Sequence, residues 1–280
     1  MHSTRIMRPL PPDTDPERLR SKAWLQFFVR VLTHRLRRSF HAVRLARPGV
    51  PAVPDELPLV IYVNHPSWWD AALVPVLLTR LFPSRRSFAP IDATALQRYG
   101  FMRRLGLFGI APDTYQGASL FLRVGHKILS QPDTVFYLTP QGRFTDARDR
   151  PVRLRPGLSH LLARVPRVTV MPVAVEYPFW EESAPEALVR FGEPMTLGSS
   201  VTAEIPEIQA LLQARLSQTM DALAEAAVSR DASRFEILLD GRAGVGGVYD
   251  AWRRLRAWRR GETFDPAHVR REQGVMKQST

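Results

Sequence analysis

Apolar residues recur along most of the chain in short blocks whose periods predict alternating helices and strands. Leu25, Val29, Leu32 and Leu36 follow one another at spacings of three and four. This is the apolar stripe of an amphipathic helix, which we expect over residues 18–45. Prolines at positions 48, 51 and 54 end the helix and form a linker.

The rest of the pattern predicts an α/β fold. A short apolar run rich in β-branched residues predicts a buried strand over residues 57–63. Further strands are predicted at 87–91, 107–111, 134–138, 168–177 and 187–191, and helices at 69–82, 96–105, 118–129, 158–164 and 204–229. Because strands alternate with helices, we expect a central mixed, largely parallel sheet flanked by helices, with an N-terminal amphipathic helical segment.

The chain divides into four segments. We interpret residues 1–17 as a flexible tail, 18–54 as the amphipathic helix and its linker, 55–240 as one large domain, and 241–280 as a basic helix with a tail. No apolar stretch typical of a signal peptide and no run of about 18 uncharged apolar residues occurs. If the protein meets a bilayer, we therefore expect it to lie on the surface.

Composition limits the chemistry. The 280 residues contain no cysteine, which excludes disulfides, thiolate zinc sites and a cysteine nucleophile. The formal net charge of +12 suits anionic partners such as a phospholipid surface, a phosphorylated substrate, an acidic carrier protein or nucleic acid. No helix-turn-helix, zinc-finger or ribonucleoprotein signature is present, so a nucleic-acid-binding protein is the weaker alternative.

The candidate chemistry lies directly after the strand predicted at 57–63. His65 and Asp70 follow it, five residues apart. A histidine can remove a hydroxyl proton near neutral pH, and a carboxylate can hold the imidazole in the required tautomer. On a regular helix five residues rotate by about 140°, so the two side chains meet only if the backbone turns between them. Pro66 favours such a turn, and we expect a strand–turn–helix junction at the carboxyl edge of the sheet.

Four blocks, taken in order, resemble those of the glycerolipid acyltransferase family, which includes 1-acylglycerol-3-phosphate acyltransferase. The family's first block, Asn-His-x-Ser-x-x-Asp, is matched by Asn64, His65, Ser67 and Asp70. Its third block ends a strand with Phe-Pro-Glu-Gly-Thr-Arg, and a similar segment occurs about 75 residues downstream, at 139–143. Residues 106–113 and 171–174 resemble the second and fourth blocks. The resemblance covers about residues 55–195, and it implies that residues 55–240 form an acyltransferase domain.

The resemblance implies transfer of a fatty acyl group from acyl-CoA or acyl-carrier protein to a hydroxyl of a lysophospholipid such as 1-acylglycerol-3-phosphate. His65 would be the general base and Asp70 its orienting partner. No metal, no cofactor other than the thioester co-substrate and no covalent acyl-enzyme are expected. The residues that would bind substrate are Asn64, Ser67, Gln141, Gly142 and Arg143, although Ser67 suits a helix cap equally well.

The third block departs from the family, which leaves the acceptor open. Gln141 stands where the family has Glu, Arg143 comes one position early, and Phe144 occupies the usual Arg position. Gly142 still permits a tight turn with exposed N–H groups for an anion, and Arg143 still offers a bidentate fork, unless it forms a structural ion pair. The alternative acceptors are a lyso-aminolipid, a glycolipid or a hydroxylated isoprenoid.

Two helices have the composition of segments that lie at a membrane surface. Those predicted at 18–45 and 248–260 combine aromatic residues with arginines. Packing against the domain with a solvated basic face is the alternative for both. We expect a peripheral protein on the cytoplasmic face of the inner membrane, in contact with an anionic surface.

Overall fold

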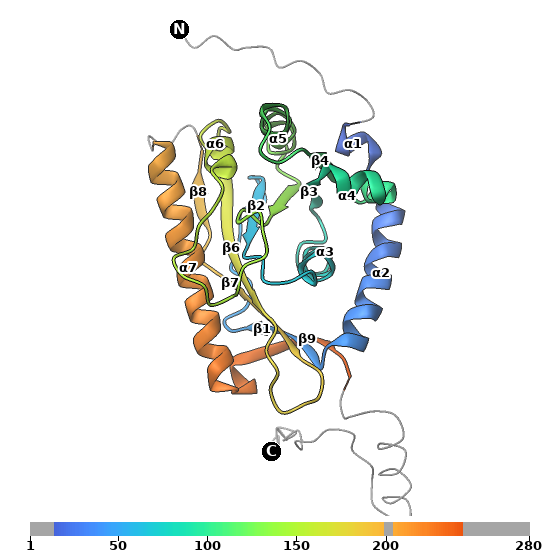
Figure 1. Cartoon of the computed structure of the whole chain (residues 1–280), viewed down its shortest axis with the longest axis vertical. Helices are drawn as coiled ribbons and strands as arrows, with labels where there is room; N and C mark the ends of the chain where they lie inside the picture. Colours follow the sequence, from blue (N-terminus) through green and yellow to red (C-terminus); the bar gives the residue numbers. More distant parts are fainter. Residues whose placement is uncertain (1–13, 199–203, 243–280) are drawn as a thin grey trace, which may run out of the picture.

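A computed structural model describes residues 14–198 and 204–242, and in this part of the chain a mixed sheet forms the centre of the molecule (Figure 1). The predicted α/β fold is confirmed. The strands are β1 (Ala42–Ala46), β2 (Leu59–Val63), β3 (Arg86–Asp92), β4 (Leu107–Ile110), β5 (Thr134–Leu138), β6 (Val168–Glu176), β7 (Glu186–Phe191), β8 (Met195–Leu197) and β9 (Phe235–Asp240).

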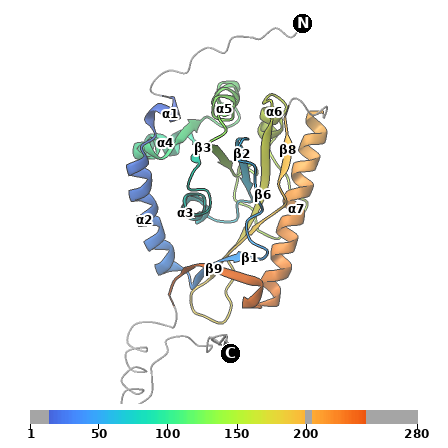
Figure 2. The ribbon, with the colours of Figure 1, turned by 180° about the vertical axis from the view of Figure 1, so that it is seen from behind.

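Helices connect most of the strands and cover both faces of the sheet (Figure 2). They are α1 (Pro16–Leu19), α2 (Lys22–Ser39), α3 (Asp70–Leu81), α4 (Ala93–Arg98), η1 (Gly100–Leu105), α5 (Tyr115–Ile128), α6 (Gly157–Leu162), α7 (Ile205–Ser229) and η2 (Ala232–Arg234). Among the described residues, no helix is both long enough and apolar enough to cross a bilayer.

The strand order places three strand ends together. The sheet runs β4-β3-β5-β2-β6-β7-β1-β9, and the first five strands are parallel to one another. β7 is antiparallel to β6, and β8 pairs with the start of β6. Pro172 lies on β6 between the residues that pair with β8 and those that pair with β7. The carboxyl ends of β5, β2 and β6 therefore lie side by side at one edge.

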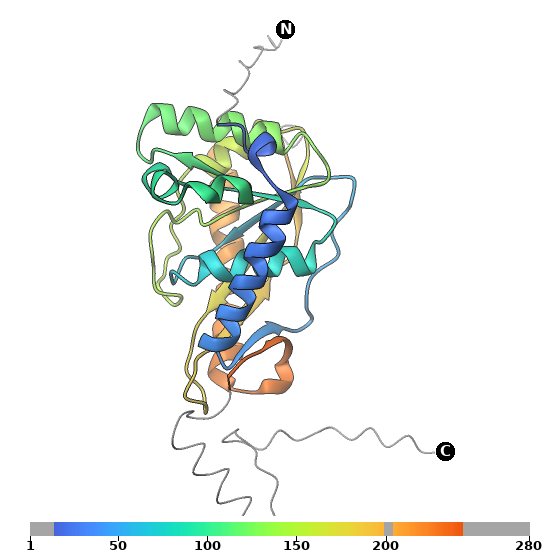
Figure 3. The same ribbon diagram turned by 90° about the vertical axis from the view of Figure 1, so that its right-hand side faces the viewer.

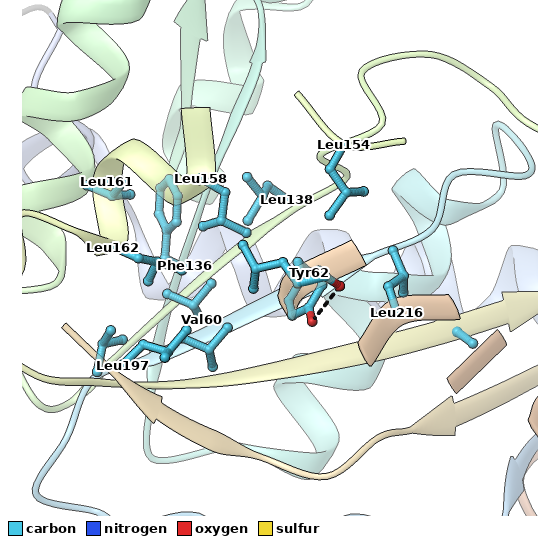
Figure 4. Packing of buried hydrophobic residues seen from close by; sticks show 14 of the residues in the cluster. Val60, Tyr62, Phe136, Leu138, Leu154, Leu158, Leu161, Leu162, Leu197 and Leu216 are labelled. Atoms are coloured by element: carbon cyan, nitrogen blue, oxygen red, sulfur yellow. Dashed lines mark hydrogen bonds between the residues drawn. The ribbon is translucent and has the colours of Figure 1, made fainter. Parts of the chain in front are cut away.

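Alternation along the buried strands builds two hydrophobic layers. Val60 and Tyr62 of β2 belong to the cluster with α5, α6 and α7, whereas Leu59, Ile61 and Val63 belong to the cluster with α2 and α3. This is the period of two expected for a strand buried on both faces. Figure 4 shows the first cluster, where the Tyr62 hydroxyl donates to the carbonyl of Leu212 (3.2 Å).

The prediction of one helix over 18–45 is wrong at its C-terminal end. α2 ends at Ser39, and β1 then enters the sheet between β7 and β9. Arg44, which that prediction places on the helix, is buried on β1 and binds Glu186 (Nε–Oε2 2.8 Å). His41 binds the same carboxylate through Nδ1 (2.6 Å). The local sequence placed Arg44 on a helix because it does not show the pairing with Glu186, which lies 142 residues further along the chain.

The N-terminal helix packs on the domain. Leu25, Val29, Leu32 and Leu36 are buried in the second cluster, and α2 runs across α3 (Figure 3).

Further differences from the predicted secondary structure concern one helix and two strands. The helix predicted at 96–105 is divided into α4 and η1, and β8 and β9 were not predicted. The helix predicted at 248–260 lies outside the described residues.

Candidate active site

Asn64 holds the end of β2 against β6. Its side-chain Nδ2 donates to the carbonyl of Val175 (3.0 Å), and its Oδ1 accepts from the N–H of the same residue (2.7 Å). The side chain thus continues the β2–β6 pairing by one step and lets the backbone turn away at His65. Asn64 is buried, and both polar ends of its side chain are used. This geometry favours a structural role over the expected contact with substrate.

His65 and Asp70 meet as the strand–turn–helix junction predicts. The chain turns after β2, and α3 begins at Asp70. His65 Nδ1 lies 2.6 Å from Asp70 Oδ2, with the imidazole 22% exposed and the carboxylate 2% exposed. Because Nδ1 faces the carboxylate, Nε2 is the nitrogen left to accept a proton from a bound hydroxyl.

Asp70 has two further hydrogen-bond donors, neither of which was predicted from the sequence. The N–H of Ser67 reaches Oδ2 (3.2 Å), and the hydroxyl of Tyr177 donates to Oδ1 (2.6 Å). Tyr177 directly follows β6, whose carboxyl end lies beside that of β2. Burial, and next the charge of Asp70, hold the pKa of Tyr177 well above its usual range, so the phenol remains a donor. The Oγ of Ser67 accepts from Trp69 N–H (3.2 Å), which is a turn-capping role.

The loop after β5 holds the backbone of His65. β2 and β5 pair in parallel with Tyr62 opposite Leu138, so three residues further on His65 lies opposite Gln141. The His65 N–H donates to Gln141 Oε1 (2.7 Å), and the His65 carbonyl accepts from the N–H of Thr145 (2.9 Å). Gln141 therefore positions His65, and the carboxylate of a glutamate could accept the same bond.

Gly142 supplies the expected tight turn but not the expected free N–H group. Its φ of 69° is a left-handed conformation that favours glycine, and its N–H donates to the carbonyl of Thr139 (3.1 Å). The Arg155 guanidinium occupies the space beside its Cα and binds Asp113 (2.8 Å). The prediction that free N–H groups of this turn bind an anion is therefore wrong for the N–H of Gly142.

Arg143 and Phe144 lie on the exposed side of this loop. Within the described residues Arg143 forms no hydrogen bond or ion pair, so the structural ion pair considered for it is not observed. The ring of Phe144 is 59% exposed, and its centroid lies 4.4 Å from that of His65. Three neighbouring arginines are instead engaged by carboxylates: Arg148 with Glu176, Arg150 with Asp221 and Arg155 with Asp113.

Exposed aromatic rings accompany the strand ends. Trp68, Phe144 and Phe179 lie in the loops that follow β2, β5 and β6, and all three are exposed. Trp69 packs against Phe40 (ring centroids 5.0 Å apart) in the second cluster. Trp69 thus has a packing role, whereas the neighbouring Trp68 is accessible. In residues 14–198 and 204–242 no three His, Asp or Glu side chains gather as metal ligands would, and we assign none.

Comparison with known proteins gives little further information. No family model and no curated protein matches the chain. A solved structure described as the 1-acyl-sn-glycerophosphate (LPA) acyltransferase PlsC from Thermotoga maritima is similar, with a TM-score of 0.49 and 13% sequence identity. The match covers 79% of this chain and 84% of that one. At this level, the likeness is no evidence of a shared activity.

Proposed function

We propose that the protein transfers a fatty acyl group from acyl-CoA or acyl-carrier protein to a lipid hydroxyl, with His65 as general base and Asp70 as its orienting partner. The observation that carries the proposal is the 2.6 Å contact between His65 Nδ1 and a buried carboxylate at the carboxyl edge of the sheet. The blocks shared with glycerolipid acyltransferases support the same chemistry.

The proposed reaction needs one proton carrier. Nε2 of His65 takes the proton of the acceptor hydroxyl while its oxygen attacks the thioester carbonyl. A C–O bond forms, the C–S bond breaks, and the imidazolium returns the proton to the departing thiolate. The Asp70 carboxylate stabilises the positive charge that the imidazole carries between these steps.

Purified protein, labelled acyl-CoA or acyl-carrier protein and a panel of lyso-lipids would test this, with products identified by mass spectrometry. We expect an acyl ester product that His65→Ala abolishes. His126→Ala is the matched control, because His126 is also half-buried but lies on α5. Near-normal turnover by a folded His65→Ala variant would contradict the mechanism.

The acceptor is proposed to carry an anionic group near Arg143, as a lysophospholipid such as 1-acylglycerol-3-phosphate does. Arg143 is exposed and has no partner among the described residues. Arg143→Ala should raise KM for a phosphate-bearing acceptor about tenfold or more. Arg153→Ala is the control, since Arg153 is also exposed and without a partner in the described part of the loop. Equal KM values in wild type and Arg143→Ala would favour a lyso-aminolipid, glycolipid or isoprenoid acceptor.

We also propose that α2 meets an anionic membrane at the cytoplasmic face, where acyl thioesters are available. Its outer side exposes Phe27 and Val31 (54% and 45%), together with Arg30 and Arg38, and the helix contains no Asp or Glu. Val31→Ser should weaken binding to phosphatidylglycerol vesicles several-fold in a flotation assay. The same change at exposed Val228 on α7 is the control. Binding to DNA but not to vesicles would instead support the nucleic-acid alternative.

A further inference from the structure

Tyr177 occupies a position that the four sequence blocks do not include. Its hydroxyl lies 2.6 Å from Asp70 Oδ1, the carboxylate oxygen that does not face His65. The tyrosine ring packs beside Phe40, with ring centroids 5.5 Å apart, in the cluster that α2 and α3 cover. A hydrogen-bonded chain thus runs from the phenol through the carboxylate to the imidazole.

We propose that Tyr177 is a positioning residue: its hydroxyl fixes the rotation of the Asp70 carboxylate and offsets part of the attraction of that carboxylate for the His65 imidazolium. This inference rests on the proposed role of His65 as general base. A donor to a carboxylate stabilises the anion and weakens its attraction for a neighbouring cation. Without the phenol, Asp70 would attract the His65 imidazolium more strongly.

The other groups around the pair cannot replace this effect. Gln141 and Phe144, which contact His65 from the loop after β5, are neutral. From α2, the Arg35 guanidinium lies over the ring of Trp69 (6.0 Å) rather than on Asp70. Glu176, the last residue of β6 and the neighbour of Tyr177 in the chain, is paired with Arg148 (2.6 Å). Among the described residues, Tyr177 is therefore the side chain that donates to Asp70 from outside the 65–70 segment.

The test is the pH dependence of kcat/KM for Tyr177→Phe, which keeps the ring and removes the hydroxyl. We expect the acidic limb to move up by about one pH unit, with activity below the limb reduced about tenfold and the alkaline plateau retained. Tyr62→Phe is the control, because it removes a buried hydroxyl that binds Leu212 instead. A loss that is equal at every pH, with the limb unmoved, would assign Tyr177 a merely structural role and overturn the proposal.

A second variant and a second readout keep the test decisive. Fluorotyrosine placed at 177 by amber suppression retains the ring and is a stronger donor, so the limb should move to lower pH. The imidazole of His65, followed by NMR in protein labelled at histidine, should titrate at higher pH in Tyr177→Phe. This measurement needs no turnover, so a His65 NMR titration that is the same in wild type and Tyr177→Phe would contradict this inference. An absence of acyl transfer by wild type would instead contradict the proposed function.

Discussion

Replacing Asp70 by asparagine should nearly stop turnover while the protein stays folded. The carboxylate accepts from His65, Ser67 and Tyr177. In the variant, the amide oxygen can serve the first two donors, and the amide nitrogen then faces Tyr177. The tyrosine hydroxyl can rotate to accept from that nitrogen, so the two side chains remain hydrogen-bonded. We therefore expect a fall of about 1 kcal/mol or less in the free energy of unfolding.

The loss of charge determines the kinetic effect. Two unit charges about 4 Å apart near a protein surface attract by about 4 kcal/mol. Asparagine withdraws this stabilisation from the imidazolium formed during proton transfer. Since each 1.36 kcal/mol in the barrier changes the rate about tenfold, kcat should fall by about 10³-fold.

The assay compares initial rates of acyl ester formation by wild type, Asp70→Asn and Asp70→Ala, with thermal unfolding measured for each. Asp70→Ala should also lower the free energy of unfolding by about 2–4 kcal/mol, because the Ser67 N–H and the Tyr177 hydroxyl lose their acceptor. A folded Asp70→Asn variant whose kcat stays within tenfold of wild type would refute the reasoning.

Two further predictions concern stability and are checked by chemical denaturation. Gly142→Ala should lower the free energy of unfolding by about 1–2 kcal/mol, because residue 142 has a left-handed φ and a new Cβ would displace Arg155. Glu186→Gln should cost about 3 kcal/mol at neutral pH by leaving Arg44 buried without a counter-charge. Burial raises the pKa of Glu186, but the hydrogen bonds from His41 and Arg44 outweigh it and hold that pKa below its usual range. The carboxylate's contribution is therefore complete above about pH 4.5 and lost as the pH falls through the lower folded pKa, so the gap between the proteins should close only in that acidic range.

Local patterns predicted the elements whose burial repeats along the chain. The apolar run of β2 and the period of α7 appear close to their expected bounds, and the α2 stripe lies on a helix shorter than predicted. β1 and β9 were missed because the residues of neither strand show a clear strand pattern by themselves. Arg44 is acceptable inside β1 only because Glu186, far along the chain, neutralises it. Such pairing is a property of the tertiary structure, and no local period reports it.

The candidate site likewise contains residues that local patterns predict and residues that only the tertiary structure brings together. Pro66 and the strand before it favour the turn that lets His65 and Asp70 meet, and the resemblance to the family blocks pointed to the same pair. Tyr177 was not predicted, because a tyrosine after an apolar strand is ordinary, and its contact with Asp70 depends on β6 lying beside β2. The role of Gln141 was likewise hidden, since its place opposite His65 follows from the register between β2 and β5.

Burial separates the residues that hold the His65–Asp70 pair from two exposed positions at which the third block departs from the family. Asn64, Asp70 and Gln141 are all buried, and each is fixed by hydrogen bonds that hold His65 or its partner. Arg143 and Phe144, two of the positions where the third block departs, are exposed, and neither side chain forms a hydrogen bond with His65 or Asp70. A change at a buried position would leave a polar group unpaired and damage the His65–Asp70 geometry. A change at 143 or 144 alters the surface that an acceptor would contact beside the imidazole. Acceptor preference can therefore vary at these two positions while the proposed chemistry is kept.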